Sequence, residues 1–243
     1  QLNEETVWGG SPHNNTNPKA KDALPRIRQL IFEGKNKEAQ ELCGPTICSQ
    51  SANGMPYQTV GSLHLDFDGI NEYNDYYRDL DIEKAIATTR FTANGVTYTR
   101  EAYTSFPDQV LVIRLTASQK KSISFTAKYS TPYKSSVIRC ISPRKELQLN
   151  GKANDHEGIE GKVEFTALTR IENNGGKLEI LSDSTLQVKD ANSVILYVSI
   201  GTNFVNYKDV SGDALNSAQQ YLKQVNKNYP KSKASHINAY QKY

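Results

Sequence analysis

Asn94-Gly95 is the feature that most constrains the fold of this chain. It separates two segments of alternating apolar and polar residues, 85–93 and 96–103. An Asn-Gly pair between such segments favours a two-residue type I′ hairpin turn, because both central residues need a positive φ. The two segments are therefore expected to pair as antiparallel strands, with a register that the turn fixes.

This register predicts which side chains face each other. Phe91 lies opposite Tyr98 on an apolar, aromatic face. Arg90 lies opposite Thr99 on the other face and diagonal to Glu101, within reach of an ion pair. We therefore expect the hairpin to belong to an antiparallel sheet with one buried face and one face of threonine and charge.

Alternation with period two continues along most of the chain. Strands are predicted at 63–67, 85–93, 96–103, 110–117, 123–129, 146–150, 163–172, 177–181, 186–189 and 194–200. So many short strands, separated by turn residues and not by helices, indicate a mainly β fold built as a large antiparallel β-sandwich. Residues 130–145 and 151–160 lack the alternation and are expected to be long loops.

A sandwich of this size needs a core of large apolar side chains. The predicted core includes Phe91, Tyr98, Val110, Val112, Phe125, Phe165 and Ile195. Val110, Val112 and Phe125 are expected on one buried sheet face, because they occupy alternating positions.

Short helices are predicted near the N-terminus, as a helical excursion over residues 18–43. Asn17-Pro18 has the residue types of a helix start, and Pro25 is expected to divide the following run into two short helices that end at Gly34. A further helix is expected to begin at Asn36, reach about Cys43 and stop at Gly44-Pro45.

The period becomes helical again after Phe204. One amphipathic helix ends at Tyr229-Pro230, and a second runs to Tyr243 without a stop signal. We interpret residues 1–208 as the sandwich domain and 209–243 as the start of a helical linker. The last pattern is unfinished at Tyr243, as in a chain cut within a helix. The apolar stripe of the linker is therefore expected to face solvent, to fold back on the sandwich, or to pair with a second copy of the chain.

Composition excludes some classes of function. Lys and Arg number 29 against 26 Asp and Glu, and the basic residues are spread along the chain, so no nucleic-acid partner is predicted. No apolar run is long enough to span a membrane. Gln1 is not an initiator Met, which leaves room for a signal peptide already removed. The three cysteines are interpreted as reduced thiols, with a Cys43–Cys48 disulfide loop left open.

The sequence offers few candidates for catalysis or cofactor binding. The acidic segment 66–72 does not match a calcium loop, because Gly69 and Tyr77 fall at the wrong positions of the template. The four histidines are scattered, without metal-ligand spacing. No nucleophile-elbow, P-loop or dinucleotide motif occurs. We therefore predict no metal, no cofactor and no catalytic residue within this chain.

Trp8, the single tryptophan, is followed by Gly9-Gly10-Ser11-Pro12. Two glycines and a proline beside an aromatic ring indicate a tight turn where the backbone approaches another part of the protein closely. From the residues alone, Trp8 either fills the edge of the sandwich or belongs to a binding surface.

The segment Glu5-Thr-Val-Trp-Gly-Gly-Ser-Pro12 resembles the opening motif of glycoside hydrolase family 95, the inverting α-L-fucosidases. Similar segments follow in collinear order at 17–34, 57–63, 77–82, 95–101, 106–110 and 236–242. The resemblance covers most of the chain and is weakest between about 130 and 160.

The resemblance implies a large sandwich of the supersandwich type, followed by helices and an (α/α)6 barrel that performs the chemistry. Because the barrel's catalytic motifs do not occur here, the chain is expected to be a non-catalytic N-terminal domain whose partners are its own catalytic domain and a fucosylated glycan. Trp8, Gly9, Gly10, Ser11, Pro12 and His13 are the candidates for an interdomain or sugar-binding surface. Export to the periplasm or the extracellular space is expected, as for enzymes that degrade glycans.

Two alternatives stay open. The chain could be a free-standing carbohydrate-binding module that stacks sugars on Trp8 and on tyrosines. It could also be the same domain from an α-L-galactosidase-type member of the family, since L-fucose is 6-deoxy-L-galactose.

Overall fold

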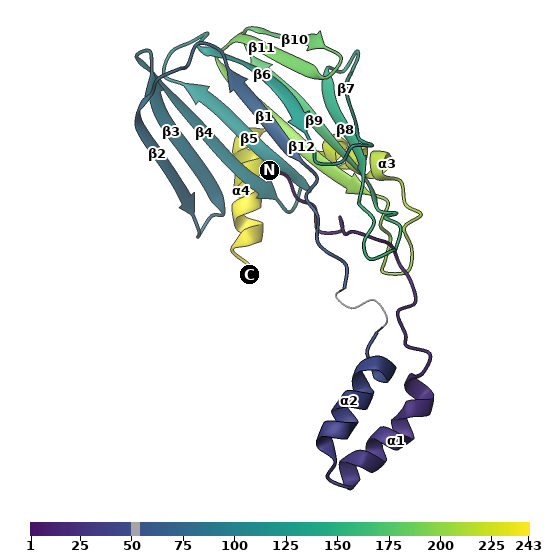
Figure 1. Cartoon of the computed structure of the whole chain (residues 1–243). Coiled ribbons are helices and arrows are strands. Elements are labelled where there is room, and N and C mark those ends of the chain that lie inside the picture. Colours follow the sequence, from purple (N-terminus) through teal and green to yellow (C-terminus); the bar gives the residue numbers. More distant parts are fainter. Residues whose placement is uncertain (50–53) are drawn as a thin grey trace.

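Two antiparallel sheets face each other in the described part of the chain, residues 1–49 and 54–243 (Figure 1). In this computed structural model the strands are β1 (Ser62–Phe67), β2 (Asn74–Asp81), β3 (Ile86–Ala93), β4 (Val96–Ser105), β5 (Val110–Ala117), β6 (Ile123–Ser130), β7 (Val137–Ile141), β8 (Glu146–Lys152), β9 (Glu164–Asn174), β10 (Lys177–Ser182), β11 (Thr185–Ala191) and β12 (Ser193–Thr202). The helices are α1 (Ala20–Phe32), α2 (Asn36–Ile47), α3 (Ala214–Gln224) and α4 (Tyr229–Tyr240). The prediction of a mainly β sandwich with short helices at both ends is confirmed.

The larger sheet has eight strands, in the order β2-β3-β4-β5-β12-β9-β8-β7. The smaller sheet has four strands, in the order β1-β6-β11-β10. The predicted hairpin is β3-β4, with Phe91 opposite Tyr98 and Arg90 opposite Thr99. Its turn at Asn94-Gly95 has φ values of 50° and 73°, as a type I′ turn requires. The predicted register is therefore confirmed.

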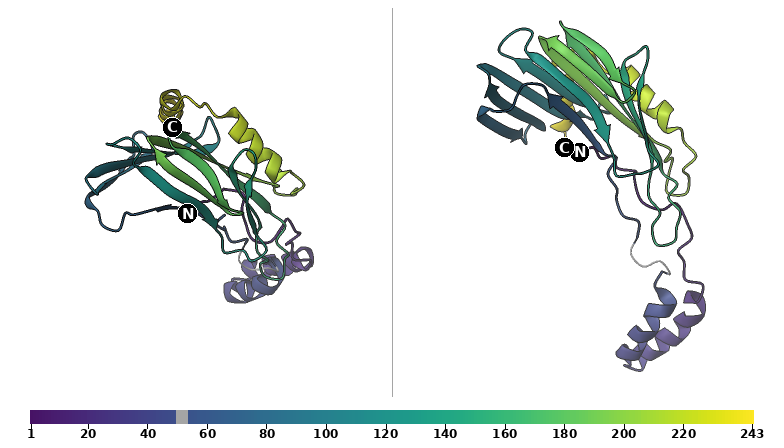
Figure 2. Two further views of the ribbon diagram at one scale, coloured as in Figure 1. Left: turned by 90° about the horizontal axis from the view of Figure 1, so that it is seen from above. Right: turned by 45° about the horizontal axis from the view of Figure 1, so that its top comes forward.

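The central strands of the larger sheet are buried on both faces. On one face Phe165 and Leu196 join Phe125 of the smaller sheet in the sandwich core. On the other face Val112 and Tyr197 pack against Leu222 of α3. Figure 2 shows α3 and α4 on the side of the larger sheet that is turned away from the smaller sheet. The prediction of a single buried face is therefore wrong where the helices cover the sheet.

The predicted core residues differ in burial. Val110, Val112, Phe125 and Phe165 are buried, whereas Phe91, Tyr98 and Ile195 are partly buried. Val110 and Val112 face the helices, while Phe125 faces the sandwich core. Their expected common face is wrong, because alternation defines a face within one strand but does not relate the faces of β5 and β6.

Polar contacts fasten α4 to the larger sheet. Ser232 Oγ donates to Asp108 Oδ2 at 2.8 Å and lies 3.1 Å from Tyr103 Oη. His236 is 3% exposed, and its Nε2 lies 2.9 Å from the carbonyl oxygen of Lys84. Of the three arrangements expected for the apolar stripe of the final helix, the structure has the second, because the stripe folds back on the sheet of the same chain.

Glu101 joins this contact and does not pair with Arg90. Its carboxylate accepts a hydrogen bond from Tyr229 Oη at 2.9 Å and forms ion pairs with Lys233 and Arg114. The Arg90 guanidinium lies over the ring of Tyr77, 5.7 Å from its centroid. The predicted Arg90–Glu101 pair is therefore wrong, because α4 brings closer partners to Glu101.

The helices α1 and α2 form an arm that extends away from the sandwich (Figures 1 and 2). Its small core consists of Ile27, Leu30 and Ala39. Helix α1 is continuous through Pro25, and the predicted division into two helices is wrong. A proline removes only one helical hydrogen bond, and packing against α2 holds both sides of that position.

Asn17 forms hydrogen bonds at both ends of the arm, the start of α1 and the end of α2. Its Oδ1 accepts from the backbone N–H of Lys19 at 3.0 Å, so α1 begins at Ala20 and not at Pro18. Its Nδ2 donates to the carbonyl oxygens of Pro45 and Cys48 at 3.1 Å and 3.0 Å. These bonds satisfy carbonyls at the end of α2, which continues past the predicted stop to Ile47.

Two strands fall outside the predicted set, and both lie at the edges of the larger sheet. β2 is exposed along almost its whole length, and β7 lies in the segment 130–145 that was expected to be a loop. Edge strands need little apolar alternation, because one side of the ladder has no neighbour.

Cys43, Cys48 and Cys140 are free thiols in the structure, in agreement with the interpretation preferred from the sequence. Among the described helices, none combines the length and the apolar character that crossing a bilayer requires.

The Glu101 contact predicts how stability depends on pH. Burial opposes ionisation of Glu101, but hydrogen bonds from Lys233 and Tyr229 and the charges of Lys233 and Arg114 outweigh it and lower its pKa below the usual value of 4.5. The contribution of Glu101 is therefore complete above that value and is lost as the pH falls through the lower pKa of the folded state. Glu101→Gln should cost about 1 kcal/mol at pH 7, a magnitude already reduced for solvent screening. Urea unfolding at pH 7 and pH 3 should show this difference shrinking in acid.

The matched control is Glu160→Gln, which removes an exposed partner of Lys152. It should change the free energy of unfolding little at either pH. A difference for Glu101→Gln that is equal at both pH values would contradict the assigned role.

Candidate functional site

The segment from Trp8 to His13 lies between the arm and the sandwich and is held by backbone hydrogen bonds on two sides. Gly9 N–H donates to the carbonyl oxygen of Pro56, and Gln58 N–H donates to that of Val7, both at 2.9 Å. Gly10 N–H donates to the carbonyl oxygen of Asn154, also at 2.9 Å. The segment is thus fixed between the chain that returns from the arm and the loop that follows β8.

The two glycines are required by this close approach. A Cβ atom on Gly9 would lie 2.8 Å from Gln58 Nε2, and one on Gly10 would lie 2.5 Å from Met55 Sδ. Gly10 also has a φ of 73°, which side chains disfavour. The sequence-based interpretation of a tight turn against another part of the backbone agrees with this geometry.

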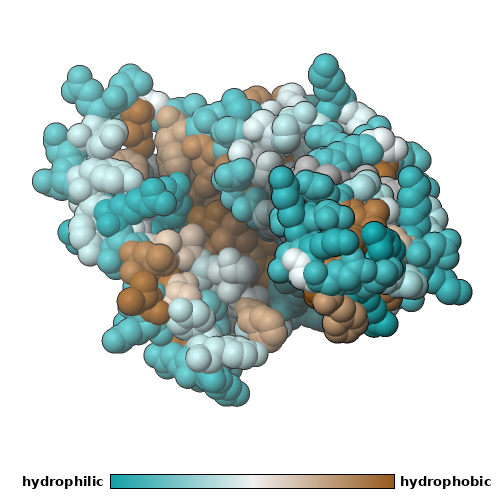
Figure 3. All heavy atoms as spheres, turned by 60° about the horizontal axis from the view of Figure 1, so that its bottom comes forward, coloured by the Kyte–Doolittle hydropathy of each residue, from teal (hydrophilic) through white to brown (hydrophobic). Residues whose placement is uncertain are grey.

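All six predicted residues, Trp8 to His13, line one pocket of about 290 Å³. Its other walls include Met55, Val163 and three residues that follow β12, namely Phe204, Tyr207 and Val210. Figure 3 brings forward the end of the molecule from which the arm extends, where hydrophilic side chains cover most of the projecting surface.

Trp8 stands at the surface of this pocket. Its side chain is 42% exposed, and its Nε1 donates to the carbonyl oxygen of Glu5 at 2.7 Å. Its ring meets Tyr57 edge-on, with centroids 5.2 Å apart. The neighbouring Val7, which is fully buried, fills the core at this point. Trp8 is therefore not part of the buried core at this edge of the sandwich.

Hydrogen bonds position the polar rim of the pocket. Thr6 Oγ1 lies 2.6 Å from Thr202 Oγ1 and 2.7 Å from Glu4 Oε2. Burial raises the pKa of Glu4 above its usual value, although the two hydrogen bonds from Thr6 act in the opposite direction. His13 Nδ1 lies 2.9 Å from the carbonyl oxygen of Ser11.

The pocket suits binding more than catalysis. An apolar, aromatic wall with a few placed polar groups is the usual composition of a ligand pocket. No carboxylate occurs among the described lining residues, whereas glycoside hydrolysis needs two carboxyl groups across the scissile bond.

The wall formed by Phe204, Tyr207 and Val210 is the part that sequence reasoning missed. Tyr207 is 75% exposed, and the Lys208 ammonium lies 5.1 Å from its ring centroid. The available signal was a pair of aromatic residues in a polar loop directly after the last strand. Such a loop has no periodicity, so the sequence does not show which part of the chain it faces.

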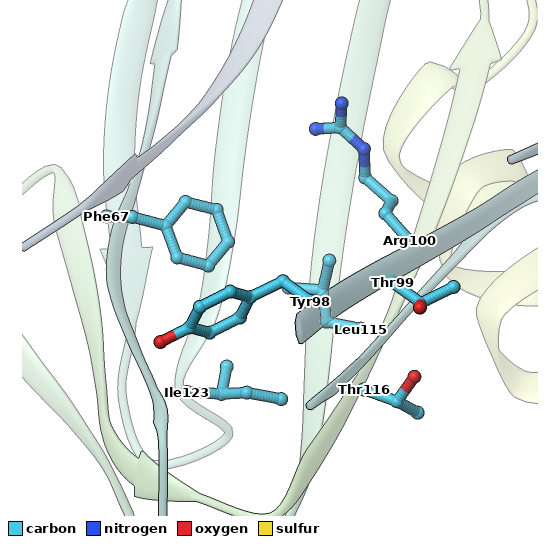
Figure 4. Close-up of a pocket in the computed structure, with 7 residues that line it drawn as sticks. All are labelled: Phe67, Tyr98, Thr99, Arg100, Leu115, Thr116 and Ile123. Atoms are coloured by element: carbon cyan, nitrogen blue, oxygen red, sulfur yellow. The ribbon is translucent and has the colours of Figure 1, made fainter. Parts of the chain in front are cut away.

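A second hollow, shown in Figure 4, is a packing gap between the sheets. It measures about 20 Å³ and lies beside Phe67, Tyr98 and Leu115. The rings of Phe67 and Tyr98 meet edge-on at 6.4 Å. The space holds about one water molecule, so it does not form a ligand site.

The acidic segment 66–72 covers the end of β1 and the loop that follows it. Asp66 forms an exposed ion pair with Lys128, with Oδ2 2.8 Å from Nζ. In the described part of the chain, no three His, Cys, Asp or Glu side chains come together as metal ligands would.

Comparison with known proteins supports the same family resemblance as the sequence motifs. Residues 1–207 match the family model described as Glycosyl hydrolase family 65, N-terminal domain. The chain is 31% identical over 229 residues to a protein named Alpha-L-fucosidase 2 from Arabidopsis thaliana, covering 84% of this chain and 26% of that protein. It is 24% identical over 258 residues to "Probable alpha-fucosidase A" from Aspergillus niger, covering 99% of this chain and 31% of that protein. The resemblance to α-L-fucosidases predicted from the sequence is therefore confirmed.

The pocket geometry predicts different effects for two glycine substitutions. Gly10→Ala should cost about 1 kcal/mol for the positive φ and a further amount because Met55 must move toward the pocket. Gly69→Ala has the same φ of 73° but no atom within 4 Å of the added Cβ, so it should pay the backbone cost alone. Urea unfolding followed by the emission of Trp8 measures both. Equal losses, with an unchanged native emission spectrum, would contradict the close approach.

Proposed function

Because the chain belongs to the Glycosyl hydrolase family 65, N-terminal domain family, we propose that it is the N-terminal sandwich domain of a longer glycoside hydrolase that acts on α-L-fucosides. The observation that carries this proposal is the match to proteins named as α-fucosidases over most of this chain. The chain spans 26% and 31% of the length of those two proteins. The remaining length is enough to hold a catalytic domain, which we propose as the partner of this one.

In this proposal the domain itself is non-catalytic. The pocket at Trp8 would contribute a sugar-binding surface beside the catalytic site, with the Trp8 ring against the apolar face of a sugar. The support is the combination of an exposed indole and a second exposed aromatic ring, Tyr207, in the lining of the same pocket. The general acid and the group that activates water would come from the remainder of the enzyme.

The proposal includes a periplasmic or extracellular location, where such an enzyme would meet fucosylated glycans. Fractionation of cells that express the full-length protein tests it. Recovery of the full-length protein in the cytosolic fraction alone would contradict this part of the proposal.

A free-standing carbohydrate-binding module is the second candidate, favoured by the 42% exposure of Trp8 in a preformed pocket. The two candidates differ in what the full-length protein does. An enzyme would release L-fucose from a fucoside, whereas a module would bind the sugar without turnover. An α-L-galactosidase would instead prefer the sugar with a 6-hydroxyl group.

The 243-residue chain alone should release no fucose from an aryl α-L-fucoside or from 2′-fucosyllactose. The physical reason is that its pocket offers no pair of carboxyl groups. The full-length protein should hydrolyse the same substrates. Turnover by the 243-residue chain that disappears on substitution of its own carboxylates would overturn the non-catalytic role.

In the full-length enzyme, Trp8→Ala should raise KM about 2- to 13-fold while kcat changes little, because ring stacking contributes about 0.5–1.5 kcal/mol. The matched control is Tyr76→Ala, which removes another exposed ring (53%) outside the pocket lining. It should leave both constants unchanged. An unchanged KM for Trp8→Ala would contradict a sugar contact and would leave Trp8 with an interdomain role.

A further inference from the structure

A further pocket, of about 370 Å³, lies on the outer face of the larger sheet beside α3, and we call it the charged pocket. It shares no residue with the pocket at Trp8. Its polar walls come from the turn before β8, from β8 and β9, and from α3. They carry three cations, one carboxylate and two amides, which are Arg144, Arg170, Lys223, Glu146, Gln219 and Gln220.

The floor of this pocket is an ion triad around one buried carboxylate, that of Glu146. Glu146 is 2% exposed, although it is ionisable. Arg170 donates to Glu146 Oε1 from Nε at 2.9 Å and from Nη2 at 2.8 Å. The Nε of Arg144 lies 3.0 Å from Glu146 Oε2. Three hydrogen bonds therefore orient the Arg170 guanidinium before any ligand arrives, and Arg144 is tethered beside it through Nε, which lowers the entropic cost of binding.

Arg170 of the triad also compensates the partial negative charge at the C-terminal end of α3. A helix C-terminus disfavours anions, because its last carbonyl oxygens carry partial negative charge. Here Arg170 Nη1 donates to the carbonyl oxygen of Leu222 at 3.0 Å, and Lys223 lies in the last turn of the helix. The negative end of the helix dipole is thus compensated from within the pocket walls.

The lining has an excess of positive charge, since three cations face one carboxylate. The nearby Glu172 pairs with Lys227, with Oε1 2.8 Å from Nζ, and adds no net negative charge. In the described part of the chain, the terminal nitrogens of Arg144 and the ammonium of Lys223 make no hydrogen bond to protein groups. Those donors are accessible, because the Arg144 side chain is 54% exposed and Lys223 is exposed.

We propose that this pocket binds an anionic sugar, with its carboxylate or sulfate group between Arg144 and Lys223. An oxyanion is the group that guanidinium and ammonium donors bind most strongly. The volume exceeds that of a bare oxyanion and accommodates a pyranose ring. The amides of Gln219 and Gln220 supply donors and acceptors for ring hydroxyls. This site is separate from the fucoside proposal and does not depend on it.

The test is a calorimetric titration of the 243-residue chain with glucuronate, glucose 6-sulfate, inorganic sulfate and glucose in 50 mM NaCl. We expect both anionic sugars to bind at least tenfold more tightly than glucose and more tightly than inorganic sulfate. Tighter binding of one anionic sugar than the other identifies the source of the oxyanion, and either order supports the site. Binding of both should weaken at least threefold in 500 mM NaCl, because the contact is ionic.

Lys223→Gln is the decisive variant, because this exposed side chain is not part of the ion triad of Glu146, Arg144 and Arg170. It should weaken binding of the anionic sugars about fivefold or more without changing the melting temperature. Arg144→Gln should weaken binding further and also lower the melting temperature, since it leaves one oxygen of Glu146 without its ionic partner. The matched control is Lys152→Gln, which removes a cation from the exposed pair with Glu160 and should change neither quantity.

Three outcomes would overturn the proposal. These are equal binding of glucose and the anionic sugars, an affinity for inorganic sulfate equal to that for the anionic sugars, and unchanged binding by Lys223→Gln.

Discussion

Burial of the central strands of the larger sheet on both faces is the constraint on which the rest of the structure depends. On β12, Val194 and Leu196 face the smaller sheet, while Ile195 and Tyr197 face the helices. A strand with two buried faces must be apolar at consecutive positions. β12 therefore lies inside the larger sheet, which is the middle layer between the smaller sheet and the helices. The loops at the ends of these layers carry the Trp8 pocket, and the seam between sheet and α3 carries the charged pocket.

The sequence correctly predicted those features of the fold that residues close together in the chain determine. The turn at Asn94-Gly95 determined a register that tertiary packing did not alter. The partners of a side chain are a different matter. Periodicity showed that α4 has an apolar stripe but not what the stripe faces, and Glu101 found Lys233 across 132 residues of sequence in place of the adjacent Arg90. Edge strands such as β2 gave no signal, because exposure on both faces removes the alternation.

The candidate site also has a part that the sequence predicts and a part that it does not predict. Trp8 to His13 could be found from sequence, because glycines and proline beside a single tryptophan mark a backbone that approaches something closely. The opposite wall at Tyr207 could not, since a loop without periodicity carries no information about its distant neighbours. The charged pocket was invisible for a related reason. Arg144 lies in a segment without alternation, and only the fold brings it to Glu146 and Lys223.

Stability alone gives little reason for the triad of Glu146, Arg144 and Arg170. Removing the Glu146 carboxylate from water costs several kcal/mol, and apolar residues of similar volume often stabilise a protein more than a buried ion pair does. Leu168 and Leu222 already line the same space, so an apolar filling was physically available. The chain instead keeps a buried carboxylate between two guanidinium groups beside an open pocket. Preorganised charge next to an open volume serves recognition better than packing, which is why this seam is the place to look for a second ligand.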